Sequence, residues 1–178
     1  MKYVYRRSLC IKMSRESGVN SGYRGGMPER DAPSSPADFK FFEPMRVRWA
    51  DVDMQGIVFN PNYLVFADNA MTEYMRAVGF PYPDALMPFG ADIFAVGSQI
   101  DFKASARFDD ALRVGARIER IGRTSFRFRI SVFRVDELLA DVRTTYVCAT
   151  PGETRQTLIV PEKFIAIVEA FEKLKPER

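Results

Sequence analysis

Two carboxylates stand directly ahead of a turn that leads into the start of a helix. Asp51 and Asp53 are followed by Gly56, and then by Asn60 and Pro61. Asparagine is a favoured N-cap and proline a favoured first helical residue, so these two residues indicate where a helix begins. The first N–H groups of a helix have no partner within it and carry positive potential. The segment therefore combines carboxylates with donors that can stabilise negative charge.

The absence of histidine restricts the chemistry of this chain. None of its 178 residues is histidine, which excludes Ser-His-Asp and Cys-His nucleophile pairs, histidine-ligated zinc and any histidine general base. If the protein is an enzyme, carboxylates or backbone dipoles must carry its chemistry. We predict no bound metal and no organic cofactor.

Length and charge favour a single folded domain without a dedicated nucleic-acid surface. A chain of 178 residues with 47% apolar and 13% aromatic residues can build one core. Residues 1–36 hold seven Lys or Arg and three acidic residues, a balance of +4, so the net charge of +3 leaves −1 for the rest. The excess positive charge therefore belongs to the N-terminal segment and not to the folded body.

Cysteine usage and hydropathy favour a cytoplasmic protein. Two cysteines, Cys10 and Cys148, are too few for a disulfide framework. A chain without such a framework is typical of a reducing compartment. The start "YRRSLCIK" is faintly similar to a twin-arginine export signal, but the apolar stretch that such a signal needs does not follow. No run approaches the roughly 18 apolar residues of a membrane span, so we expect none.

The chain divides into an extension and a folded domain of mixed elements. Residues 1–38 are rich in Ser, Gly, Pro and Arg without periodicity, which predicts a disordered extension, and residues 39–178 form the predicted domain. Alternation over 44–50 predicts a strand, with Met45, Val47 and Trp49 on one face. Apolar spacing predicts a helix from Asn60 to about Val78, closed by Gly79.

Four further strands and a last helix complete the predicted domain. Alternating segments occupy 91–104, 111–121, 124–135 and 138–149, and short separators predict that the last three form an antiparallel meander. Within 111–121, the alternation predicts that Leu112, Val114, Ala116 and Ile118 point inward. Pro161 opens a C-terminal helix. The predicted class is α+β, with a curved antiparallel sheet wrapped around a long central helix.

A motif between the first strand and the central helix resembles a known family. It consists of Asp53, Gly56, Ile57, Val58, Pro61, Asn62 and Tyr63. Together with the order of elements over residues 42–170, it is similar to hotdog-fold acyl-CoA thioesterases of the 4-hydroxybenzoyl-CoA thioesterase type. The resemblance implies a hotdog fold and a homodimer or homotetramer whose acyl-CoA sites lie between subunits.

The resemblance also implies roles for individual residues. Asp53 takes the position of the catalytic carboxylate, which would attack the thioester carbonyl or deprotonate water; the sequence does not choose between these routes. The Asn60 N–H is the candidate oxyanion donor, because Pro61 has no N–H. One departure is the Asn60 side chain, since many relatives carry histidine there and others tyrosine.

The remaining candidates have plainer interpretations beside the functional ones. Gly56 and Tyr63 belong to the motif and are predicted to bind substrate. Lys103 and Arg107 could meet CoA phosphates or form a solvated strand end. Asp51 is predicted to stabilise the loop as an acceptor. Tyr63, Phe66 and Met71 are predicted to belong to the core or to line the acyl pocket. Asp68 is predicted to be a partly buried structural carboxylate and Cys148 a buried hydrophobe. A sheet face that is either solvated or in contact with another subunit is predicted for Arg113, Arg117, Arg127 and Arg129.

Three functions follow from these observations. The leading one is hydrolysis of acyl-CoA thioesters, with acyl-CoA as the substrate and no nucleic-acid partner. A second is a non-catalytic acyl-CoA binding or scaffolding protein in which Asn60 replaces a needed group. The third, nucleic-acid binding through the basic extension and the arginine-rich sheet face, predicts a steep salt dependence of affinity. Hotdog hydratases generally use a histidine, which this chain lacks.

Overall fold

The computed structural model describes residues 34–178. Its helices and strands, in chain order, are the short 3-10 helix η1 (Pro36–Asp38), β1 (Phe41–Arg46), η2 (Trp49–Asp51), α1 (Asn62–Ala77), η3 (Met87–Phe89), β2 (Asp92–Phe102), β3 (Ala111–Ile121), β4 (Ser125–Arg134), β5 (Glu137–Ala149) and α2 (Glu162–Phe171). The predicted disorder of the first 33 residues, and nucleic-acid binding by that segment, concern residues outside this part of the chain.

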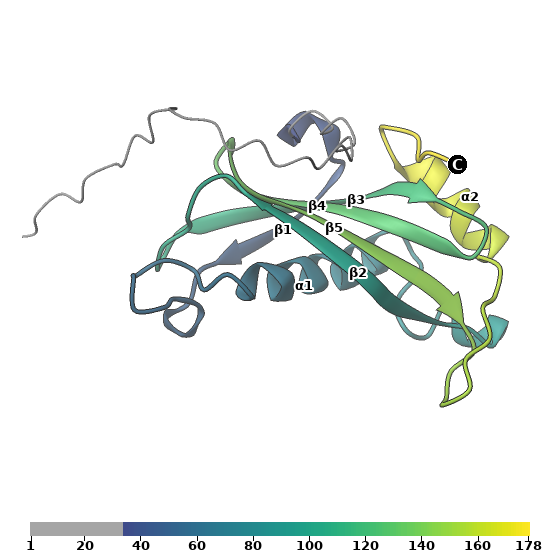
Figure 1. The fold of residues 1–178 in the computed structure, drawn as a ribbon. Coiled ribbons are helices and arrows are strands. Elements are labelled where there is room, and N and C mark those ends of the chain that lie inside the picture. The colour runs from purple at the N-terminus through teal and green to yellow at the C-terminus, as the bar shows by residue number, and fades with distance from the viewer. Residues whose placement is uncertain (1–33) are drawn as a thin grey trace, which may run out of the picture. The chain divides into compact units, whose positions relative to one another are not determined.

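Five strands form one antiparallel sheet that curves over the long helix α1 (Figure 1). The strand order is β1-β3-β4-β5-β2, so the predicted meander of β3, β4 and β5 is confirmed as the centre of the sheet. Strand β2 pairs with β5 and lies at one edge, while β1 lies at the other. The predicted α+β hotdog fold, a curved antiparallel sheet with a central helix, is confirmed.

The predicted strand at 44–50 is displaced toward the N-terminus. Strand β1 ends at Arg46, and Trp49 belongs to the 3-10 turn η2. Val47 is buried but Trp49 is 76% exposed, so the prediction that the two share one face of a strand was wrong. The reason is local: the Asp51 N–H donates to the Arg48 carbonyl (3.0 Å), which turns the chain away from the sheet.

Helix α1 begins two residues later than the sequence predicts. Asn60 and Pro61 form a turn in which the Asn62 N–H donates to the Phe59 carbonyl (2.8 Å), and Pro61 occupies the capping position. Asn60 is therefore not the N-cap. At the other end Gly79, with φ of +78°, follows the helix as expected. Glu73 and Arg76 form an ion pair on the exposed side of the helix.

The core lies between α1 and the concave face of the sheet. The helix buries Tyr63, Phe66, Ala67, Ala70, Met71, Tyr74 and Met75, and β3 buries Leu112, Val114, Ala116 and Ile118 as predicted. Full burial of a large apolar side chain contributes about 1.5–3 kcal/mol, so this interface holds the sheet and helix together. Phe164 and Val168 of α2 join the same core.

The described structure includes residues 34–38, which the sequence assigned to the extension. The Ser35 hydroxyl accepts the Ala37 N–H (3.3 Å) and Asp38 Oδ2 accepts the Ser35 N–H (2.8 Å), an arrangement that caps η1. The Ser34 hydroxyl lies 3.3 Å from Asp141 Oδ1, to which it donates, so this short segment is tied to β5.

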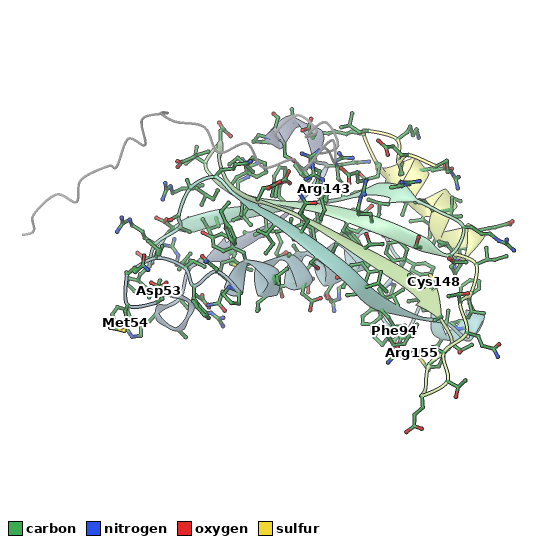
Figure 2. The ribbon with its side chains drawn as sticks, in the orientation of Figure 1. Asp53, Met54, Phe94, Arg143, Cys148 and Arg155 are labelled. Atoms are coloured by element: carbon green, nitrogen blue, oxygen red, sulfur yellow. The ribbon has the colours of Figure 1, made fainter. Side chains whose placement is uncertain are left out.

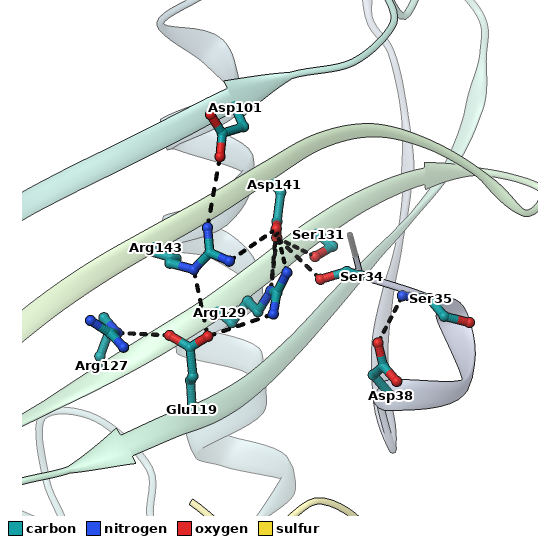
Figure 3. Close-up of polar contacts among 10 residues, drawn as sticks. All are labelled: Ser34, Ser35, Asp38, Asp101, Glu119, Arg127, Arg129, Ser131, Asp141 and Arg143. Atoms are coloured by element: carbon teal, nitrogen blue, oxygen red, sulfur yellow. Dashed lines mark hydrogen bonds and ion pairs between the residues drawn. The ribbon is translucent and has the colours of Figure 1, made fainter. Parts of the chain in front are cut away.

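The arginine-rich sheet face is a network of ion pairs (Figure 3). Arg129 donates to Asp141 (2.8 Å) and Arg127 donates to Glu119 (2.7 Å). Arg117 and Arg129 are buried, so the interpretation of this face as simply solvated does not hold for these two residues. No helix within residues 34–178 has the length and apolar character needed to cross a bilayer.

Candidate active site

The loop between η2 and α1 holds Asp53 in a tight turn. Asp53 donates its N–H to the Ile57 carbonyl (2.9 Å), and its own carbonyl accepts the Gly56 N–H (2.9 Å). Gly56 has φ of +72°, a conformation that favours glycine. Figure 2 shows Asp53 and Met54 on this loop, at the end of the molecule opposite Phe94, Cys148 and Arg155.

The Asp53 carboxylate takes part in the turn with one of its oxygens. Oδ1 accepts the Gln55 N–H at 2.7 Å, which is a common use of aspartate in turns. Oδ2 has no hydrogen-bond donor among residues 34–178, and the residue is half-buried. The carboxylate is therefore oriented by the turn while one oxygen remains available.

Asp51 connects this loop to both neighbouring elements. Its buried carboxylate accepts the Arg48 N–H (2.7 Å) and two guanidinium hydrogen bonds from the same residue (2.8 and 3.1 Å). Its backbone carbonyl accepts the Phe59 N–H and the Asn62 side-chain amide, both at 2.9 Å. The hydrogen bonds from Arg48 hold the pKa of the Asp51 carboxyl below its usual range. The predicted loop-stabilising role of Asp51 agrees with these contacts.

The N-terminus of α1 presents one backbone donor beside this loop. The N–H groups of Asn62, Tyr63 and Leu64 donate to carbonyls of the preceding turn, and Pro61 has none. The Asn60 N–H has no acceptor within the described residues, and Asn60 is exposed. This donor lies at the positive end of the helix dipole.

Two cavities flank the loop and divide the predicted site residues between them. The larger, of about 810 Å³, is open and is lined by Trp49, Ala50, Val52, Asp53, Met54, Gly56, Phe59, Asn62 and Phe108. The smaller, of about 160 Å³, is lined by Val58, Asn60, Tyr63, Phe102, Lys103, Ala104 and Ser105. Asp53 and Gly56 thus face the first cavity, and the second brings together Asn60, Tyr63 and Lys103. Arg107 lines neither cavity; its backbone bridges Ile57.

Four exposed side chains around the larger cavity form what we call the apolar rim: Trp49, Met54, Phe59 and Phe108. The rings of Trp49 and Phe108 meet edge to face, with centroids 5.5 Å apart. Neither aromatic was predicted from the sequence as a site residue. A usable signal was present, because each lies among charged residues in a segment that joins regular elements.

Tyr63 is part of the core and also of the smaller cavity. Its hydroxyl accepts the Ala106 N–H (3.0 Å), and its ring packs edge to face on Phe102. Burial raises the pKa of this phenol, so it stays protonated near neutral pH. For Phe66 and Met71 the sequence also left two interpretations, core or pocket lining, and both residues are buried in the core.

Two other predictions concern residues away from the cavities. Asp68 is exposed, so the expectation of a partly buried carboxylate was wrong; Asp68 lies just outside the buried stripe of α1. Cys148 is buried as expected, and burial raises the pKa of its thiol to about 11. Within residues 34–178 no group of acidic or cysteine side chains could hold a metal ion.

Comparisons with known proteins agree with this arrangement. Residues 55–140 match the model of the thioesterase superfamily. An acyl-CoA thioesterase, YbgC, from Haemophilus influenzae is 26% identical over 138 residues, which cover 78% of this chain and 98% of that protein. The acyl-CoA thioester hydrolase YbgC of Escherichia coli O6:H1 is 29% identical over 124 residues, 69% of this chain and 91% of its own length.

A solved structure has the same architecture. The 4-hydroxybenzoyl-CoA thioesterase of Pseudomonas sp. strain CBS-3 superposes with a TM-score of 0.66 at 27% identity, over 71% of this chain and 97% of that one. The match over residues 55–140 covers the end of the Asp53 loop, helix α1, strands β2 to β4 and the start of β5, but not Asp53 itself. The chain is similar to the thioesterase superfamily over these residues, and it is a thioester hydrolase with the hotdog fold.

Proposed function

We propose that this protein hydrolyses acyl-CoA thioesters, with Asp53 as the catalytic carboxylate and the Asn60 N–H as the oxyanion donor. The observation that carries the proposal is a half-buried carboxylate on a loop that ends at a helix N-terminus. Within residues 34–178, one carboxylate oxygen and one N–H at that terminus have no hydrogen-bond partner. The relatives described as acyl-CoA thioesterases supply the substrate class.

Two routes use the same groups. In the first, Asp53 attacks the carbonyl carbon, the C–S bond breaks, CoA leaves as the thiolate, and water hydrolyses the resulting anhydride to free the acid and the carboxylate. In the second, Asp53 accepts a proton from a water molecule that attacks the carbonyl. In both, negative charge develops on the carbonyl oxygen. A positioned backbone N–H typically contributes about 10²- to 10³-fold to such a step.

The other predicted residues would hold the substrate. Gly56 leaves space beside Asp53, because a Cβ built there meets no atom within 4 Å. Tyr63 would shape the smaller cavity, and Lys103 in its lining, together with exposed Arg107, would meet CoA phosphates. The reducing cytoplasm, which the two cysteines favour, is the compartment in which we place this reaction.

We also infer that the site is completed by a second copy of the chain. Strand β2 has 11 residues and pairs only with β5 among the described residues, so its other edge is unpaired. Residues 95–99 in the middle of this strand are exposed. An unpaired strand of this length readily pairs with another chain. Assembly of a homodimer or homotetramer at this edge would also account for the exposure of the apolar rim in a single chain.

The decisive experiment measures thiol release from a panel of acyl-CoAs with the wild type and Asp53→Asn. Asparagine keeps an oxygen that can accept the Gln55 N–H, so the turn should persist while the nucleophile or base is lost. We expect kcat to fall by about 10²- to 10⁴-fold. Asp84→Asn is the matched control, since Asp84 is an exposed loop residue outside both cavities.

Two results would contradict the proposal in different ways. Wild-type turnover in Asp53→Asn would remove Asp53 from the mechanism while leaving the activity intact. Tight binding of an acyl-CoA without hydrolysis across the panel would instead favour the non-catalytic binding protein, in which the Asn60 side chain replaces a group needed for turnover.

A further inference from the structure

The Asp51 carbonyl accepts hydrogen bonds from residues on both sides of Asn60, whose N–H is the proposed oxyanion donor. It accepts the Phe59 N–H at 2.9 Å and the Asn62 Nδ2 amide at 2.9 Å. Phe59 directly precedes Asn60, and Asn62 follows it after Pro61. A single carbonyl oxygen therefore fixes the chain before and after the Asn60 N–H.

That carbonyl is itself held in place from the side of β1. The carboxylate of the same residue is fixed by three hydrogen bonds from Arg48, one of them from its backbone N–H. The Asp51 side chain is 5% exposed whereas that of Arg48 is 72% exposed, so the carboxylate sits inward and the guanidinium covers it. Asp51 is two residues before Asp53, and the two share one short segment.

The Asn62 amide is the contact in this arrangement that ordinary helix geometry does not require. The backbone N–H groups at the start of α1 are already satisfied by the preceding turn. The amide instead reaches back across the loop, and it also lines the larger cavity beside Asp53. Its effect is to join the helix N-terminus to the segment that carries the carboxylate.

We propose that the Asn62 side-chain amide is a positioning group, which sets the distance between the Asp53 carboxylate and the Asn60 N–H through the Asp51 carbonyl. This inference rests on the proposed function. Two groups that act on one carbonyl must keep a fixed separation, and a displacement of about 1 Å can reduce turnover about 10²-fold. A positioning group of this kind affects kcat more than the binding of substrate.

The test compares Asn62→Ala with Asn69→Ala in the full-length protein. Asn69 is an exposed residue of the same helix outside both cavities, so its replacement controls for the change in helix propensity. For Asn62→Ala we expect kcat to fall about 10- to 100-fold with KM within about twofold of the wild type. Asn69→Ala should match the wild type in both constants.

Amide hydrogen exchange separates positioning from general destabilisation. Loss of the amide should speed exchange at Phe59, whose N–H shares the Asp51 carbonyl, while amides of β4 and β5 keep their protection. A fall in kcat accompanied by faster exchange throughout the sheet would overturn the inference in favour of a structural role. A rise in KM with unchanged kcat would overturn it in favour of direct substrate contact.

The outcome is distinguishable from failure of the proposed function. If the wild type hydrolyses an acyl-CoA and Asn62→Ala equals Asn69→Ala in kcat, the positioning role is wrong and the function stands. If the wild type hydrolyses none of the panel, the proposed function fails first and the positioning role fails with it.

Discussion

At the scale of single residues, the Asp53 carboxylate makes a structural contact and still leaves one oxygen for the catalytic role that we propose. One oxygen of Asp53 orders the turn by accepting the Gln55 N–H, and the other has no donor among the described residues. The neighbouring Asp51 differs, because Arg48 and its own burial commit both carboxylate oxygens to the fold. Two aspartates in one short segment thus have environments suited to different tasks.

The Asp51 environment predicts a loss of stability in acid. Hydrogen bonds from Arg48 lower the pKa of Asp51 in the folded state, so the folded protein binds the proton less readily than the unfolded chain. The stabilising contribution is therefore complete well above the unfolded value of about 4 and is lost as pH falls through the folded pKa. Thermal unfolding between pH 2 and 7 should show a lower melting temperature for Asp51→Asn near neutrality, with the difference narrowing in acid.

Asp84→Asn serves again as the control for this measurement, because Asp84 is exposed and makes no hydrogen bond within residues 34–178. A difference between Asp51→Asn and the wild type that stays constant down to pH 2 would contradict a role for the ionised carboxylate.

At the scale of elements, helix α1 is fastened at both ends by polar contacts that the apolar core cannot supply. Its N-terminus is joined to the Asp51 carbonyl through Asn62. Near its other end the Tyr74 hydroxyl donates to Glu172 Oε1 (2.6 Å), which also accepts the Ile118 N–H of β3 (2.9 Å). The buried Glu172 carboxylate, just after α2, therefore links α1, β3 and α2.

Removal of the Tyr74 hydroxyl should destabilise this junction. In Tyr74→Phe the Glu172 carboxylate remains buried with one donor fewer, at a cost of about 1–3 kcal/mol. Burial already raises the pKa of Glu172. The loss of unfolding free energy in Tyr74→Phe should therefore increase as pH rises and the Glu172 carboxyl ionises. Urea unfolding at pH 5 and pH 8 measures the effect, and Tyr82→Phe is the control, since Tyr82 is only half-buried. An equal free energy of unfolding in Tyr74→Phe and the wild type would show that this bond contributes nothing.

At the scale of the whole molecule, two exposed surfaces of the described residues favour assembly. One is the free edge of β2 and the other is the apolar rim beside Asp53. An exposed apolar surface with a cavity is typical of a site that a ligand or partner covers. Both surfaces are accounted for if two copies assemble and share the catalytic site.

A charge placed on the β2 edge should weaken that assembly. Val96 is 62% exposed at the register shift near the middle of the strand, and lysine is a residue that protects strand edges from pairing. Val96→Lys is expected to shift sedimentation toward the monomer and to reduce turnover in parallel. Val135→Lys in the β4–β5 turn is the control, as another exposed valine. An unchanged sedimentation coefficient in Val96→Lys would contradict assembly at this edge.

The sequence predicted the regular elements well because their signals are local and periodic. The predicted strand at 111–121 coincides with β3, and alternation identified its inward residues. Apolar spacing likewise identified the buried face of α1. The errors lie at Trp49 and Asn60, where hydrogen bonds between neighbouring loop residues replaced the expected strand and cap.

By itself, then, the sequence determined the fold, the family motif and the choice of Asp53, because periodicity, residue type and the lack of histidine are properties of the chain. The tertiary structure alone decided what surrounds that residue. The turn of Asp53, the shared Asp51 carbonyl and the meeting of Trp49 with Phe108 depend on contacts between segments. Such contacts form only when the sheet and α1 bring those segments together, so no local pattern could have specified them.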